Sequence, residues 1–131
     1  MLIVVADDLP KSALELLRAE GWTVDARSGR TPEQLKGDLP EADAIVVRSA
    51  TKVTADIIAA APKLRAIARA GTGVDNVNVE AASGRGIVVM NAPGANSISV
   101  AELAMAQLLS LARKLPGAEL LPAAPDWATR E

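Results

Sequence analysis

The chain has 131 residues, enough for one ordinary domain and too few for two full-sized ones. Its net charge is -2, from 14 basic and 16 acidic residues, and no lysine/arginine cluster indicates a nucleic-acid partner. There is no cysteine, which excludes disulfides and thiolate metal sites, and no histidine, the commonest general base and metal ligand. No apolar run approaches the roughly 20 residues that span a bilayer, and no signal peptide opens the chain. We therefore expect a cytoplasmic protein with no metal site and no membrane partner.

The first forty residues predict two strands and two helices. Residues 2–6 form an uninterrupted apolar run of strand length, as expected for a strand that is buried on both faces. A helix follows, ends at Gly21, and leads into a weaker strand over 22–26 that is expected near a sheet edge. The motif Thr-Pro-Glu-Gln at 31–34 is typical of a helix start, with a cap, an early proline and a glutamine three residues after the cap. Pro40 ends this second helix.

The alternation continues through the rest of the chain. Strands are expected over 44–47, 64–68 and 87–90, separated by a helix over 54–61 and a helical turn over 79–83. Ser99 and Glu102 have the spacing of a capping box, which predicts a long helix that runs to about Leu115. The chain should therefore form one domain over 1–116, followed by a tail or linker over 117–131.

Five strands joined by helical crossovers predict an α/β fold. The expected architecture is a flavodoxin-like three-layer sandwich, with a parallel sheet in the order 2-1-3-4-5 and a long apolar C-terminal helix. That last helix, over 98–115, is apolar around nearly its whole circumference, so more than one surface should cover it. A second domain, a second copy of the chain or the tail could do so, and self-association as a homodimer or other oligomer through this helix is the expected result.

Four ordered motifs stand at the predicted strand ends and the start of the last helix. They are VRSATKVT at 47–54, ARAGTGVDNV at 68–77, GIVVMNAPGANS at 86–97 and VAEL at 100–103. Together they closely resemble the N-terminal substrate-binding domain of D-3-phosphoglycerate dehydrogenases, within the D-2-hydroxyacid dehydrogenase family. The resemblance covers about residues 1–116. It implies NAD-dependent oxidation of a small phosphorylated hydroxy acid, 3-phosphoglycerate, in the first step of serine biosynthesis.

The resemblance also assigns roles to particular residues. It implies substrate contacts for Arg48, Ser49, Arg69 and Gly71, and places Thr72 and Asn96 along the cleft that faces the cofactor. The residue types agree, because a polyanion needs cations and backbone N–H groups that converge at strand ends. A lone arginine at a strand end is more often a solvated surface charge, but two at adjacent strand ends within matching motifs favour an anion site.

The family's nucleotide-binding domain has no counterpart in these residues. That domain carries the arginine that binds the substrate carboxylate and the His–Glu pair that transfers the proton, and this chain has no histidine. We therefore expect no catalytic residue here, no tight binding of NAD and no activity of the isolated chain. The alternative is a free-standing or engineered scaffold or binding domain without catalysis. The sequence is compatible with a natural short protein, a truncated piece or an engineered domain.

Two other interpretations of short motifs are rejected. Gly71-Thr72-Gly73 begins like the dinucleotide fingerprint GxGxxG, but Asn76 occupies the third glycine position and the motif follows the fourth strand. Asp7 and Asp8 are similar to the acidic pair of a receiver domain, but such a domain needs an aspartate where Arg48 stands. The acidic pair is expected instead to stabilise the loop and to favour the start of the first helix.

Overall fold

The computed structural model describes residues 1–115 of the chain, so the predicted tail over 117–131 lies outside the described residues. The strands are β1 (Leu2–Val5), β2 (Thr23–Ala26), β3 (Ala44–Val47), β4 (Ala66–Arg69) and β5 (Val88–Met90). The helices are α1 (Lys11–Ala19), α2 (Pro32–Asp38), α3 (Ala55–Ala59), α4 (Val79–Gly84) and α5 (Ser97–Ala112). The contacts divide the chain into two compact units, Met1–Ala95 and Asn96–Glu131, and each is described by itself.

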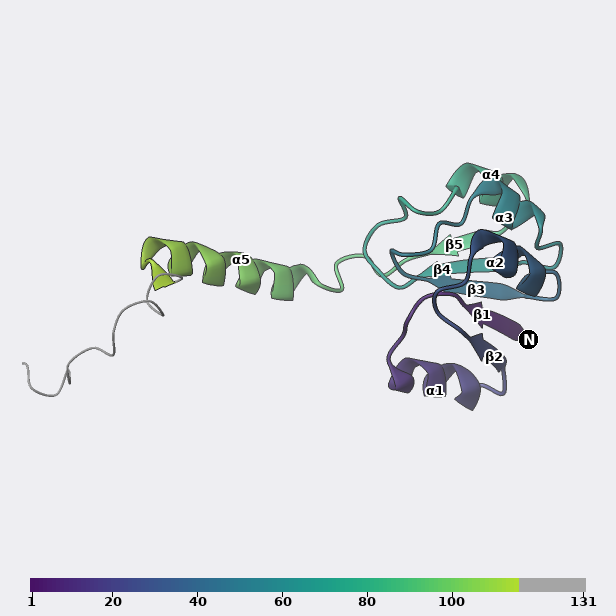
Figure 1. The fold of residues 1–131 in the computed structure, drawn as a ribbon, viewed down its shortest axis with the longest axis horizontal. Coiled ribbons are helices and arrows are strands. Elements are labelled where there is room, and N and C mark those ends of the chain that lie inside the picture. Colours follow the sequence, from purple (N-terminus) through teal and green to yellow (C-terminus); the bar gives the residue numbers. More distant parts are fainter. Residues whose placement is uncertain (116–131) are drawn as a thin grey trace, which may run out of the picture. The chain divides into compact units, whose positions relative to one another are not determined.

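The five strands form one parallel sheet in the order β2-β1-β3-β4-β5 (Figure 1), which confirms the predicted order. The register places Ile45 of β3 beside Val4 of β1 and Ile67 of β4. It also pairs Val47 with Arg69, so Arg48 follows one residue beyond this level. Both arginines therefore stand at the carboxyl edge of the sheet, on neighbouring strands.

The hydrophobic core lies on the face of the sheet that α2, α3 and α4 cover, whereas α1 lies on the opposite side (Figure 1). Side chains from the three helices meet those of the central strands, and the fully buried ones include Leu35, Leu39, Ile57, Ile58, Ile45, Ile67 and Val47. The core contains aliphatic side chains only, in agreement with a chain that lacks phenylalanine and tyrosine. Short loops at the carboxyl ends of β3 and β4 are thus anchored to a well-packed sheet.

Local capping signals determine where the short helices begin. At α2, Thr31 Oγ1 accepts from the backbone N–H of Gln34 at 3.3 Å, and Gln34 Oε1 accepts from the N–H of Thr31 at 2.9 Å. This is the predicted capping box, and it satisfies two N–H groups that the first helical turn would otherwise leave without partners. The side chains of Thr54 and Asn78 also cap α3 and α4, each by accepting a hydrogen bond from the backbone N–H three residues further on. These caps fix how the chain leaves each loop of the candidate site.

Helix α5, in the second unit, begins earlier than the sequence predicts. Its N-cap is Asn96, without a side-chain cap hydrogen bond, and Ser99 already lies inside the helix. The prediction of a capping box at Ser99 and Glu102 is wrong, because the Ser99 hydroxyl donates back to the carbonyl oxygen of Asn96 at 3.0 Å. Within the described part of the chain, no helix has the length and hydropathy that crossing a membrane requires.

Candidate functional site

The two predicted arginines differ in how they are held. Arg69, with a side chain 12% exposed, donates from Nε to Asn76 Oδ1 at 3.1 Å and from Nη1 to the Gly73 carbonyl at 3.0 Å. Arg48 is exposed, and its Nη1 donates to the Asp8 carbonyl at 3.3 Å. Most of the Arg48 guanidinium is therefore open to an incoming anion, whereas Arg69 is partly engaged by the loop that follows it.

The Arg69 guanidinium lies in the space that a side chain at Gly71 would occupy. A Cβ atom at Gly71 would lie 2.7 Å from Arg69 Nη1 and 3.0 Å from Cζ, closer than van der Waals contact allows. The nearest carboxylate, Asp75, is 83% exposed and lies 3.8 Å from Arg69 Nη2. Since exposed ion pairs of this kind stabilise little, the positive charge of Arg69 remains available at the edge of the sheet.

Backbone N–H groups accompany the arginines. No backbone carbonyl of the described residues accepts a hydrogen bond from the N–H of Thr72, Gly73 or Val74. N–H groups without internal partners are available as donors, and successive N–H groups in a turn are a known kind of anion site. Ser49, directly after Arg48, is exposed at the same edge. The Met1–Ala95 unit thus brings the predicted residues at 48, 49, 69, 71 and 72 to neighbouring loops, while Asn96 belongs to the other unit.

Asp7 lies beneath the Arg48 loop and is buried, with 7% of its surface exposed. Its Oδ2 accepts from the backbone N–H of Arg48 at 2.6 Å and of Thr51 at 3.2 Å, and its Oδ1 accepts from the Thr51 hydroxyl at 2.5 Å. Burial acts to raise the pKa of Asp7, but hydrogen bonds from Thr51 and from the backbone of Arg48 and Ala50 outweigh it and lower the pKa. Asp7 is therefore an ionised carboxylate that fixes the loop after β3.

The sequence predicted a second role for Asp7. It predicted that Asp7 and Asp8 favour the start of α1, but the N-cap of that helix is Pro10 and its first turn contains no acidic residue. This part of the prediction is wrong, because the Asp7 carboxylate forms hydrogen bonds to the loop after β3 instead of to a helix N-terminus. Its position directly after a buried strand was the only signal in the sequence.

Asn76 connects the loops after β3 and β4. Its Nδ2 donates to the carbonyl oxygens of Arg48 at 2.7 Å and Thr51 at 2.6 Å, while its Oδ1 accepts from Arg69 Nε. In the sequence, Asn76 belongs to the motif at 68–77 and breaks a glycine pattern, but no role of its own is predicted for it. A carboxamide carries both donors and an acceptor, so it can bridge a guanidinium and backbone carbonyls. The fold is needed to show that both kinds of partner lie within its reach.

A second arginine pair, Arg27 and Arg30, is neutralised by carboxylates and is therefore not a candidate anion site. Arg27 bonds to Asp25 at 2.6 Å and to Asp38 at 2.8 Å, and Arg30 lies 2.8 Å from each of the same carboxylates. The hydrogen bond from Arg27, aided by Arg30, holds the pKa of Asp25 at about 2. The two positive charges are thus matched by two ionised carboxylates. In contrast, the charge at Arg48 and Arg69 has no buried carboxylate paired with either guanidinium among the described residues.

The loops after β3 and β4 contain no glycine-rich turn that leads directly into a helix N-terminus, and no cluster of acidic side chains that could hold a metal occurs among residues 1–115. The pyrophosphate of NAD is normally bound where a glycine-rich turn meets a helix N-terminus. Here the turn after Gly71 leads to Asn76, whose amide is already engaged, and Asn78 caps α4 by accepting from the N–H of Ala81 at 2.9 Å. We therefore derive no cofactor step from these residues.

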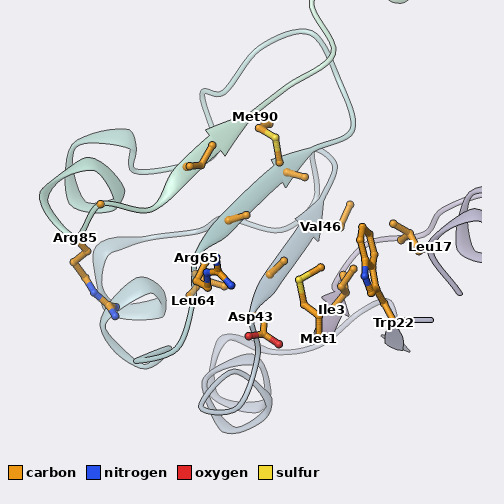
Figure 2. Close-up of a pocket in the computed structure, with 15 residues that line it drawn as sticks. Met1, Ile3, Leu17, Trp22, Asp43, Val46, Leu64, Arg65, Arg85 and Met90 are labelled. Carbon is orange, nitrogen blue, oxygen red and sulfur yellow. The ribbon is translucent and has the colours of Figure 1, made fainter. Parts of the chain in front are cut away.

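A cavity of about 680 Å³ lies on the face of the sheet opposite α2, α3 and α4 (Figure 2). Rows of strand side chains form its floor: Ile3, Ala44, Ala66 and Val88 in one row, and Val46, Ala68 and Met90 in the next. Trp22 stands at one side and Arg85 at the other. Arg85 is engaged by the carbonyl oxygens of Ala61 and Pro62, and no hydroxyl side chain lines the cavity. This surface is mainly apolar, although Asp43 and Arg65 also line it.

Residues 3–131 match the family described as D-isomer specific 2-hydroxyacid dehydrogenase, catalytic domain. The chain is 44% identical to D-3-phosphoglycerate dehydrogenase of Archaeoglobus fulgidus over 131 residues, which is 100% of this chain and 25% of that protein. A structure of NAD+-bound 3-phosphoglycerate dehydrogenase from Entamoeba histolytica is 35% identical, has a TM-score of 0.74, and is matched over 84% of this chain and 38% of that one. For the TT0316 protein of Thermus thermophilus the identity is 31%, the TM-score 0.84, and the shares 97% and 43%. The chain spans about a quarter of the length of its curated relatives.

Proposed function

Because the chain belongs to the D-isomer specific 2-hydroxyacid dehydrogenase family, we propose that it is the substrate-binding portion of an NAD-dependent 3-phosphoglycerate dehydrogenase. The main support for this proposal is the pair of guanidinium groups at adjacent strand ends, beside backbone N–H groups that have no backbone acceptor among the described residues. The proposed ligand has a carboxylate and a phosphate, and both groups accept hydrogen bonds from guanidinium and backbone N–H donors. The charge and the hydrogen-bonding groups of the ligand therefore suit this edge of the sheet.

The proposed roles follow from how each donor is held. Arg48, whose guanidinium is open, would bind one anionic group of the substrate through paired N–H donors. Arg69 would contribute N–H donors of Nη2, since its Nε and Nη1 already donate to the loop. Ser49 and the backbone from Gly71 onward would add hydroxyl and N–H donors. These residues bind and orient an anion, and no proton transfer is assigned to them; the roles of Thr72 and Asn96 beside a cofactor stay predictions.

Calorimetric titration of the isolated chain tests this proposal. We expect saturable heat with 3-phosphoglycerate and none with NAD, because the anion-binding groups lie in this chain whereas a dinucleotide turn does not. Glycerol, which lacks both anionic groups, is the matched ligand control and should give no heat. The absence of heat with 3-phosphoglycerate as well would contradict the proposal and favour the alternative of a scaffold domain without catalysis. Heat with NAD alone would contradict both.

We further propose that isolated chains associate through helix α5. Its large apolar side chains are exposed, namely Ile98, Val100, Leu103, Met105, Leu108, Leu109 and Leu111. A contiguous apolar surface of this kind is typical of an interface. In sedimentation experiments the chain should form dimers or larger species, and Leu109→Glu should shift it towards monomer, whereas the Gln107→Glu control should not. A wild-type chain that stays monomeric at high concentration would exclude this mode of association.

A further inference from the structure

A single side-chain amide links the two loops that carry the candidate cations. The hydrogen bonds of Asn76 reach 28 residues back to Arg48, 25 residues back to Thr51 and 7 residues back to Arg69. An asparagine has two N–H donors and one carbonyl oxygen. Both donors are directed to backbone carbonyls of the β3 loop, and the oxygen is directed to the guanidinium at the end of β4. The side chain therefore couples the two loops to each other.

The hydrogen bond to Asn76 restrains the orientation of the Arg69 guanidinium. Nε donates to Asn76 and Nη1 donates to the Gly73 carbonyl, so two of the three guanidinium nitrogens are bonded to the loop that follows β4. Gly71 lies against the same group at a distance that leaves no room for a side chain. Nη2 is then the nitrogen of Arg69 that an external anion would meet, and the anion would replace the exposed Asp75 carboxylate that lies 3.8 Å from it. Without the Asn76 oxygen, rotation about the side-chain bonds would no longer be restrained at Nε.

Asn76 acts on Arg48 through the backbone. The carbonyl of Arg48 accepts from Asn76, while the N–H of Arg48 donates to Asp7 at 2.6 Å. The peptide groups on both sides of the Arg48 Cα are thereby held, although the side chain itself is exposed. The Cα atom of Arg48 is therefore held in place relative to Arg69 in the absence of ligand.

We propose that Asn76 is a positioning residue that sets the geometry of the Arg48–Arg69 pair. The proposal rests on the proposed function, because it concerns the same anion-binding edge. Donor groups that are already held in their bound arrangement lose less conformational freedom on binding. Affinity therefore depends on the hydrogen bonds of Asn76, which brace the two loops, as well as on the donors themselves. Asn76 itself contacts no ligand in this account. Its removal should weaken anion binding even though both arginines are kept.

Two measurements on the isotope-labelled full chain test the proposal. The Nε–H signal of Arg69 in NMR spectra should be protected from solvent exchange in the wild type without ligand, and should lose this protection in Asn76→Ala. Asn76→Asp keeps an acceptor for Arg69 and should retain the protection. In calorimetry, Asn76→Ala should bind 3-phosphoglycerate about tenfold more weakly. The control is Asn78→Ala, which removes the cap of α4 and so destabilises the chain without touching either arginine.

The outcomes separate this proposal from the one on which it rests. If the wild type binds 3-phosphoglycerate and Asn76→Ala binds it equally well, with Arg69 still protected, Asn76 has no positioning role. If the wild type does not bind the ligand, the proposed function fails, and the exchange of Arg69 Nε–H still decides whether Asn76 holds the arginine. If Asn76→Ala does not fold, the wild-type spectrum decides. An Nε–H that exchanges freely until inorganic phosphate is added would overturn the proposal.

Discussion

Replacing Asp7 with alanine should lower the free energy of unfolding by about 3 kcal/mol. The substitution would leave the backbone N–H groups of Arg48 and Thr51, together with the Thr51 hydroxyl, without their acceptor. A buried donor left unsatisfied costs roughly 1–3 kcal/mol, and water can reach part of this loop once the carboxylate is gone. Urea denaturation gives the free energy directly. The control is Asp8→Ala, which removes an exposed carboxylate and should change the stability by less than about 0.5 kcal/mol.

The pH dependence of this difference distinguishes the Asp7 hydrogen bonds from simple loss of packing. The pKa of Asp7 is lowered from its ordinary value of 3.8, so its stabilising contribution is complete above that value. The contribution is lost as the pH falls through the lower pKa of the folded chain, because protonation removes the acceptor charge. The wild type should therefore lose its advantage over Asp7→Ala as the pH falls below about 4. An advantage that stays constant down to pH values of about 2 would contradict an ionised Asp7.

Replacing Arg69 with alanine should weaken the binding of 3-phosphoglycerate at least tenfold, which corresponds to about 1.4 kcal/mol. Arg69 contributes a positive charge at the candidate site, and it also holds the turn through Gly73. The matched control is Arg65→Ala, since Arg65 is exposed and immediately precedes β4 at the other end of the same strand. Both variants remove one positive charge, so only the position differs. Calorimetric titration of the two variants compares them directly.

A second variant tests the same site without removing a charge. In Gly71→Ala the new Cβ would force the Arg69 guanidinium to move, because it would lie 2.7 Å from Nη1. Binding should weaken, whereas Gly37→Ala should leave it unchanged, since a Cβ there meets no atom within 4 Å. Equal losses for Arg65→Ala and Arg69→Ala, or for phosphate-bearing and neutral ligands, would contradict the assignment of Arg69 to the anion site.

The fold could be predicted because its signals are local. Apolar runs and helix caps stand in the sequence where the structure has β3 and α2, and the handedness of crossovers then fixes the strand order. The positions of Arg48 and Arg69 follow from the same reasoning, since neighbouring parallel strands end at one edge. The Ser99 prediction was wrong because a serine hydroxyl can cap a helix or bond back within it, and local sequence favours both.

The supports of the candidate site could not be predicted in this way. Asp7 meets Arg48 and Thr51 across 41 and 44 residues, and the choice of partners depends on side-chain geometry that the strand order alone does not fix. Asn76 lies within the motif at 68–77, but the motif alone gives this side chain no partner. The apolar cavity was also missed, because it depends on which sheet face the helices leave open. Such features arise from packing between distant segments.

The brace formed by Asp7 and Asn76 has a consequence for how the chain acquires its binding site. Its contacts join residues that follow β1, β3 and β4, so they form only after these three strands have paired. A growing chain on the ribosome would hold both arginines in an unordered arrangement until Asn76 had emerged. Peptides that copy the two loops alone should likewise lack the arrangement. The arrangement of the two arginines is thus a property of the paired strands β1, β3 and β4, and it is gained only after Asn76 has been synthesised.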